Sequence, residues 1–296
     1  MFTSLESRAM GGLGGLLGGL LGLALPTHAP MEALLRQHAT QIDALKQTTK
    51  HQDENYLLRF VLAYPDDAQK QTQAFDKVTQ WRRGPRRDVC QIAERAISEA
   101  TKTGKWDNKI VVESAPHAKK IMPFIGASQI QTIPGRGYLA YVIRASAIDE
   151  AELMASVTKE ELAEFFIYAK EVNAQVALKR SAETGRFIQC VTANDLTGIG
   201  LLSGKEFRDA LSLASKETAM MYPGIAGTTV LLNLPPLLSA LVKLFTPLFP
   251  KAVLDRLKFE RGPLSTVSDL RELLLDGQGL VPKARSAFLA DLDALV

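Results

Sequence analysis

Two short apolar runs separated by one helix constrain the fold more than any other feature of this sequence. Residues 187–192 (FIQCVT) and residues 228–234 (TTVLLNL) are β-branched and apolar, with almost no alternation. Such runs are typical of strands buried on both faces. Residues 205–221 place apolar side chains at helical spacing, and a Pro-Gly pair ends that helix. The order strand, helix, strand predicts a parallel pair joined by a crossover helix.

The segment after the second run, residues 237–249, is apolar nearly all round. Lys243 is its only charged residue. A helix of this composition is either buried in the core or covers something apolar, and most apolar helices are simply buried. The residues alone leave both interpretations open.

These blocks resemble the CRAL-TRIO lipid-binding family, which includes yeast-type phosphatidylinositol/phosphatidylcholine transfer proteins, tocopherol transfer protein and retinaldehyde-binding protein. The resemblance lies in residues 195–203 (DLTGIGLLS), 222–249 (YPGIAGTTVLLNLPPLLSALVKLFTPLF) and 252–259 (AVLDRLKF). Residues 55–83, which begin NYLLRF and end TQWRR, resemble the helical signature of the family. The resemblance covers roughly residues 50–275. It implies an α/β fold: a three-layer α/β/α domain with a mixed, largely parallel sheet, preceded by a small all-helical domain.

The resemblance also implies a function and a site. It predicts that the chain binds one hydrophobic ligand, a phospholipid or other lipid, in a closed cavity and transfers or presents it between membranes. Residues 237–249 would be the gate helix and its flanks. The implied lipid-binding residues are Tyr141, Cys190, Thr192, Leu237, Leu238, Leu241, Phe245 and Arg256. For Cys190, a small buried core residue is at least as good an interpretation.

The headgroup is predicted from positions that differ from the family pattern. Members that bind phosphatidylinositol surround its phosphate with charged residues, and the matching positions here hold Tyr64, Pro65, Gly224, Ile225 and Arg256. Only one cation, Arg256, survives. A buried phosphate without charge-assisted partners costs several kcal/mol. We therefore expect weak or no phosphatidylinositol transfer and a preference for a choline lipid or a less polar hydrophobe.

The chain divides into four predicted parts. These are an apolar Gly/Leu-rich tail at 1–29, a helical region at 30–105, the lipid-binding domain at 106–285 and a C-terminal tail at 286–296. The boundary between the helical region and the lipid-binding domain falls in a Gly-, Pro- and Lys-rich stretch. Within this stretch, residues 109–113 (KIVVE) predict a brief strand. Further along, residues 138–143 predict a strand, and Thr158 with Glu161 predicts a capping box before a long helix.

The tail at 1–29 has three open interpretations: disordered, membrane-touching, or a targeting segment. Its Gly/Leu run at 11–25 is shorter than the roughly 20 residues that span a bilayer. Small residues repeat every four positions, a spacing that brings helices close in lipid. We expect a cytoplasmic, peripheral membrane protein, with targeting by this segment as the alternative. The basic WRRGPRR stretch at 81–87 contacts either anionic headgroups or the C-terminal end of its own helix.

Composition argues against several other classes of protein. The net charge of +3 is too small for a nucleic-acid binder, and two cysteines a hundred positions apart do not form a disulfide framework. The four histidines lack metal-ligand spacing. We expect a monomeric carrier that is not an enzyme and needs no cofactor or metal, with a lipid and, transiently, a membrane surface as partners.

Two alternatives remain: a dinucleotide-dependent oxidoreductase, and an adaptor that keeps the fold without a ligand. Residues 198–203 nearly make a dinucleotide-binding glycine pattern but depart at its last position. The following strand offers no acid for a ribose hydroxyl.

The gate assignment gives a testable prediction. Changing Leu241 or Phe245 to Asp should slow lipid exchange between vesicles far more than it lowers the melting temperature, because a gate must present its apolar surface to a bilayer. If both variants unfold, or if exchange is unchanged in folded protein, the segment is ordinary core.

Overall fold

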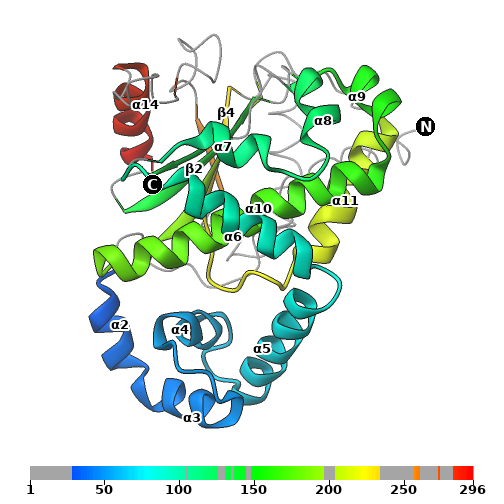
Figure 1. Ribbon diagram of the computed structural model, residues 1–296. Coiled ribbons are helices and arrows are strands. Elements are labelled where there is room, and N and C mark those ends of the chain that lie inside the picture. The colour runs from blue at the N-terminus through cyan, green and yellow to red at the C-terminus, as the bar shows by residue number, and fades with distance from the viewer. Residues whose placement is uncertain are drawn as a thin grey trace, which may run out of the picture.

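The computed structural model describes residues 29–104, 106–125, 131–134, 137–144, 148–196, 204–233, 257–260, 273 and 283–295. These residues form a helix-rich, mixed α/β fold (Figure 1). The segment 237–249 and the predicted tail at 1–29, apart from Ala29, lie outside them.

The centre of the fold is a five-stranded sheet in the order β1-β2-β3-β4-β5. Its strands are β1 (Gln131–Pro134), β2 (Tyr138–Arg144), β3 (Gln189–Asp195), β4 (Ala226–Leu232) and β5 (Leu257–Glu260). Strands β2 to β5 are parallel, and β1 pairs antiparallel with β2. The predicted parallel pair is confirmed, since β3 and β4 are adjacent and α11 (Lys205–Thr218) connects them.

Helices cover both faces of this sheet. The 26-residue helix α10 (Lys159–Thr184) contacts β2 and β3 on one face and packs along α11. Its predicted capping box is present, because the side chains of Thr158 and Glu161 each accept from the other's backbone N–H. On the other face, α14 (Lys283–Asp293) packs its Phe288 and Leu292 against the sheet. The Tyr138 hydroxyl donates to Asp293 Oδ1 across 2.6 Å and fixes that contact.

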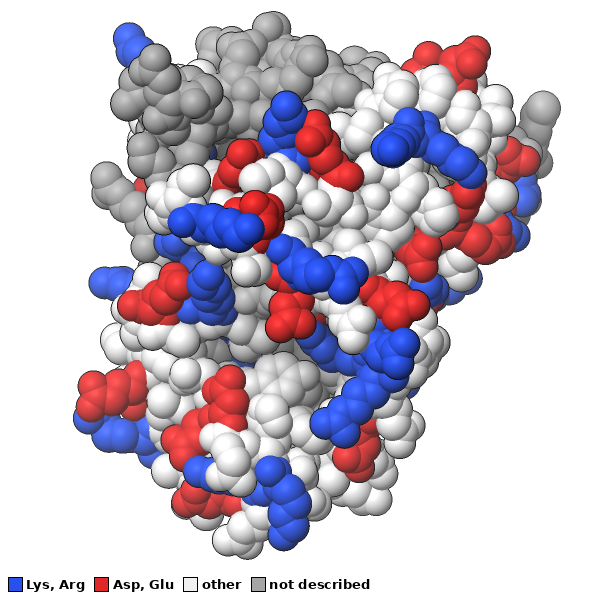
Figure 2. All heavy atoms as spheres, in the orientation of Figure 1, with Lys and Arg blue, Asp and Glu red and all other residues white. Residues whose placement is uncertain are grey.

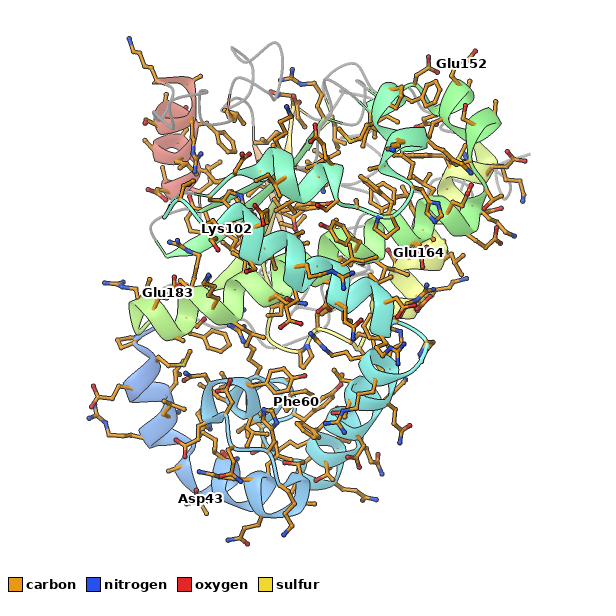
Figure 3. All side chains as sticks on the ribbon, in the orientation of Figure 1. Asp43, Phe60, Lys102, Glu152, Glu164 and Glu183 are labelled. Atoms are coloured by element: carbon orange, nitrogen blue, oxygen red, sulfur yellow. The ribbon has the colours of Figure 1, made fainter. Side chains whose placement is uncertain are left out.

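Residues 31–100 form a series of helices joined by short turns. The helices are α2 (Met31–Gln37), α3 (Ala39–Thr49), α4 (Glu54–Ala63), α5 (Ala68–Arg83) and α6 (Arg87–Ala100). We call α2 to α5 the small lobe; it gathers beyond α10 at one end of the molecule (Figure 1). Phe60 is fully buried inside this lobe, whereas Asp43 lies at its outer edge (Figure 3).

The predicted strand at 109–113 is wrong, because this segment is the helix α7 (Asn108–Glu113). Its Val-Val pair favours a strand locally, yet the Asp107 side chain caps the helix by accepting from Lys109 N. The Tyr168 hydroxyl on α10 donates to the Val111 carbonyl at 2.7 Å. Capping and packing on α10 therefore override strand propensity. Two further helices, α8 (Ala118–Ile125) and α9 (Glu150–Ser156), flank β1 and β2 in the sequence.

Arg59 on α4 joins the small lobe to the α/β part. Its side chain is buried and donates to Gly224 O at 2.8 Å, to Ser181 Oγ at 3.0 Å and to Ile188 O at 3.0 Å. The guanidinium carbon also lies 4.5 Å from the ring centre of Phe187. One side chain thus holds α4 against α10, the start of β3 and the turn before β4.

This arrangement predicts that Arg59→Met destabilises the protein by about 3 kcal/mol, because two buried carbonyl groups lose their donor. Arg36→Met is the matched control. Arg36 pairs with Glu32 at the surface, where both side chains are more than two-thirds exposed (71% and 79%), so its loss should cost less than about 0.5 kcal/mol. Urea unfolding measures both, and equal midpoints would contradict the prediction.

Candidate functional site

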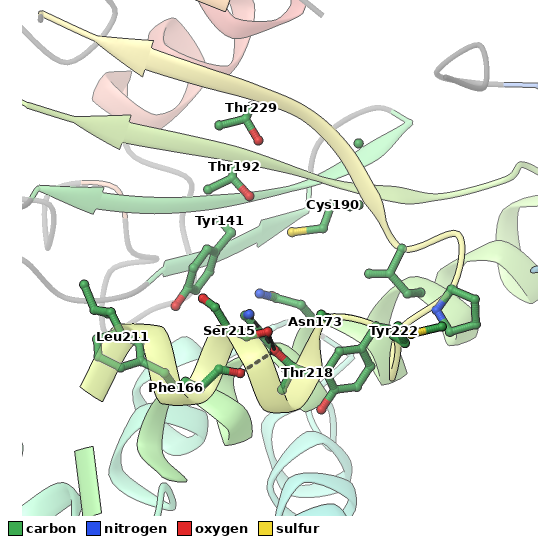
Figure 4. A pocket seen from close by; sticks show the side chains of 18 of the residues that line it. Tyr141, Phe166, Asn173, Cys190, Thr192, Leu211, Ser215, Thr218, Tyr222 and Thr229 are labelled. Carbon is green, nitrogen blue, oxygen red and sulfur yellow. Dashed lines mark hydrogen bonds between the residues drawn. The ribbon is translucent and has the colours of Figure 1, made fainter. Parts of the chain in front are cut away.

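A cavity of about 470 Å³ lies between the sheet and the helices α10 and α11. This volume is within the range of pockets that hold small molecules, about 300–1,000 Å³. Its walls combine aliphatic and aromatic side chains with a few polar groups (Figure 4). The apolar members include Ile143, Phe166, Leu211, Ala214 and Ile225.

The floor of the cavity is a row of hydroxyl groups across three parallel strands. Tyr141 on β2 is in register with Thr192 on β3, and Thr192 is in register with Thr229 on β4. Because side chains alternate along a strand, all three, with Cys190, project from the sheet toward α11 (Figure 4). Within the described residues, none of these three hydroxyls hydrogen-bonds to another group of the protein. The floor therefore exposes to the cavity three hydroxyls that have no partner among the described residues.

Among the described residues that line the cavity, the cation is Lys170 on α10, on the wall opposite the floor. Its Nζ donates to Thr218 Oγ1 on α11 at 2.7 Å, and Thr218 in turn donates to Ala214 O at 2.6 Å. Burial lowers the pKa of Lys170 to about 8. Among the described residues no carboxylate forms an ion pair with Lys170. The cavity therefore contains an ammonium group without a counter-ion from that part of the chain.

The other titratable groups of the cavity stay neutral near pH 7. Burial raises the pKa of the Cys190 thiol to about 12 and raises the pKa of the Tyr141 phenol well above its usual value. Burial likewise raises the pKa of Tyr222. These groups can donate hydrogen bonds but carry no charge.

The structure places the sequence-predicted residues as follows. Tyr141, Cys190 and Thr192 all line the cavity; their contact with a lipid remains a prediction. Leu237, Leu238, Leu241, Phe245 and Arg256 lie outside the described residues.

Sequence reasoning missed Thr229 and Lys170. Thr229 was within reach, because the predicted strand at 228–234 lies next to the one that carries Thr192. The signal for Lys170 was a lysine four positions after Phe166, on the face of the long helix that meets the sheet.

Two arginines of the basic 81–87 stretch form ion pairs with glutamates of other helices. Arg82 binds the buried Glu171 on α10 at 2.5 Å, and Arg86 binds Glu217 on α11 at 2.5 Å and Glu164 on α10 at 3.0 Å. On the face shown in Figure 2, acidic and basic side chains are interspersed. Arg82 and Arg86 therefore hold helices together, whereas Arg83 and Arg87 are exposed.

The described part of the chain contains no group of three or more His, Cys, Asp or Glu side chains that could hold a metal ion. Among its helices, none is long and apolar enough to cross a membrane.

No family model matches the sequence, and no curated protein matches it. Among solved structures, the crystal structure of Sfh5 is similar, with a TM-score of 0.46 and 10% identity over 99% of this chain and 98% of that chain. At this level of likeness, the function of this chain has to be argued from its own cavity.

Lys170, which is partly buried, gives a prediction about stability. Its folded pKa lies below its unfolded value, so the unfolded chain binds the proton more tightly and the group destabilises the fold below about pH 8. Lys170→Met should therefore stabilise the ligand-free protein at pH 7, by on the order of 2 kcal/mol after allowance for partial exposure.

That advantage over wild type should shrink as the pH rises from 8 to about 10. The measurement is the difference in unfolding free energy between wild type and Lys170→Met, obtained from urea unfolding at each pH. Both proteins contain the same cysteines, so the ionisation of these cysteines in the unfolded state contributes equally to both and cancels in the difference. A difference in stability that does not change with pH would contradict the assignment.

Proposed function

We propose that this protein binds one hydrophobic ligand, a phospholipid or other lipid, in the cavity between the sheet and α10 and α11, and transfers or presents it between membranes. The observation that carries the proposal is the cavity itself, with apolar walls and a row of free hydroxyls. An acyl chain gains about 0.8 kcal/mol for each methylene removed from water, so apolar walls supply affinity. Hydroxyls at one place orient a polar headgroup.

The arrangement we propose has three layers, with α10 and α11 over one face of the sheet and α14 over the other, preceded by the small helical domain. We propose, from the family resemblance, that residues 237–249 serve as a gate for the ligand. The protein works as a cytoplasmic carrier that touches membranes transiently and catalyses no reaction.

For the ligand, we keep the expectation from the sequence that phosphatidylinositol is a poor cargo. Gly224 and Ile225 stand at two of its expected phosphate-binding positions. Gly224 contacts Arg59 and Phe187 closely and has a φ of +66°, so this turn is committed to packing. A choline lipid or a less polar hydrophobe remains the proposed cargo.

Lipid extraction and mass spectrometry of the protein purified from its source test the proposal directly. A lipid present at about one molecule per protein would support a carrier and identify the ligand. Protein without bound lipid that also fails to take one up from vesicles would favour the adaptor. Saturable micromolar binding of NADH, followed by tryptophan fluorescence, would favour the oxidoreductase.

Filling the cavity should abolish binding without unfolding the protein. Thr192→Phe places a ring in the middle of the hydroxyl row, and we expect it to lower lipid uptake from vesicles at least tenfold because it occupies the ligand's space.

Thr228→Phe is the matched control, since the alternation of β4 puts Thr228 on the face away from the cavity. It should bind lipid as the wild type does. Equal uptake by the two variants, with both folded by circular dichroism, would show that lipid does not enter this cavity.

A further inference from the structure

Lys170 is the feature of the cavity that a simple hydrophobic carrier does not need. An ammonium group has three N–H donors, and within the described residues Lys170 uses one of them, in the hydrogen bond to Thr218. A charge in apolar surroundings costs free energy unless it is paired. Replacing Lys170 by an apolar side chain would fill the same wall at lower cost, so its presence calls for a partner.

The charged groups around Lys170 do not supply that partner. From α10, Glu171 is bound by Arg82, and from α11, Glu217 is bound by Arg86. The sheet contributes Cys190 and Tyr141, and the turn after α11 contributes Tyr222, all neutral near pH 7. Tyr64, at the end of α4, is a further phenol with a pKa raised by burial. Among these described groups, no free carboxylate competes for the ammonium.

We propose that Lys170 binds the oxyanion of the ligand's headgroup, a carboxylate or a phosphate, so that the protein selects amphiphiles whose headgroup carries an oxyanion over amphiphiles of the same chain length without one. This inference rests on the proposed function and specifies its ligand class. An oxyanion in the cavity would accept charge-assisted hydrogen bonds from the two unused N–H groups of Lys170. The Tyr141 hydroxyl on the opposite wall is free to donate as well. Phosphatidylcholine has no net charge, but its phosphate is such an oxyanion. The inference therefore retains the choline lipid as the proposed cargo and argues against the less polar hydrophobe.

Matched ligand pairs that differ only in the headgroup test this inference. Delipidated full-length protein is loaded with a neutral probe, a fluorescent fatty alcohol, which is then displaced by oleic acid or by oleyl alcohol at pH 7. We expect Lys170→Met to weaken oleate at least tenfold and to change oleyl alcohol less than about twofold, because a hydrogen bond between charged groups is lost only with the acid. Lys170→Arg should keep oleate within about threefold of the wild type.

Lysophosphatidic acid and monoolein form a second pair that separates the two sources of oxyanion. Dependence of lysophosphatidic acid alone on Lys170 would indicate a phosphate headgroup, and dependence of oleate alone would indicate a carboxylate; either supports the inference. Lys179→Met is the control variant, since it removes an exposed lysine from the same helix and should leave every ligand unchanged.

The wild-type protein provides a measurement that needs no variant. The carboxyl group of oleate stays ionised above pH 7, whereas Lys170 loses its proton near pH 8. The preference for oleate over oleyl alcohol should fall about tenfold between pH 7 and pH 10.

Three results would overturn the inference in distinguishable ways. Anions that displace the probe equally from wild type and Lys170→Met would refute the role of Lys170, with the carrier function intact. An anion preference that is flat from pH 7 to pH 10 would refute it in the same way. A neutral probe that binds neither protein would refute the proposed function together with the inference.

Discussion

The wall of the cavity around Gly224 depends on the hydrogen bonds of the buried Arg59 guanidinium. Burial lowers its pKa to about 9, so it is still charged at pH 7, and no described carboxylate pairs with it. Its charge is offset by two carbonyls, one hydroxyl and the face of Phe187. One of these carbonyls belongs to Gly224, and the residues on both sides of Gly224 line the cavity. A Cβ on Gly224 would meet Arg59 Cβ at 3.2 Å, so glycine is required for this close approach. The small lobe therefore holds the turn around Gly224, which forms one wall of the cavity, through Arg59.

A second set of contacts ties the basic stretch after α5 to the helices that face the sheet. Trp81 Nε1 and Arg86 share the carboxylate of Glu217 on α11, and Arg82 reaches the fully buried Glu171 on α10. Arg86, Glu164 and Glu217 are partly exposed, so the two ion pairs of Arg86 contribute orientation more than stability. Lys170 follows Glu171 in the sequence. Because Arg82 binds Glu171 on one side of α10, the neighbouring lysine on the cavity side is left without that carboxylate.

The parts of the fold that the sequence predicted are those specified by short-range chemistry. The runs that became β3 and β4 and the capping box of Thr158 and Glu161 can each be read within a few residues. The segment at 109–113 was mispredicted because its two valines favour a strand, whereas Asp107 and Tyr168, which decide the outcome, are a cap and a distant hydroxyl. Tyr141, Cys190 and Thr192 came from a family resemblance, and strand alternation explains why the last two share a face. Lys170 was missed because its significance depends on which side of a long helix meets the sheet, a property of tertiary packing.

The sheet floor and the helical wall of the cavity make different contributions to stability and to binding. The floor is rigid, because a parallel sheet holds Tyr141, Thr192 and Thr229 in register through backbone hydrogen bonds that do not involve their hydroxyls. Those hydroxyls are thus available without any cost to the sheet. The helical wall places the Lys170 ammonium across from them, and no described carboxylate pairs with it. In the proposal above, a bound anion would offset the cost of this charge. The apolar walls would then supply affinity for the acyl chain of a ligand. Lys170 would discriminate between headgroups, although the empty fold would be more stable without its charge.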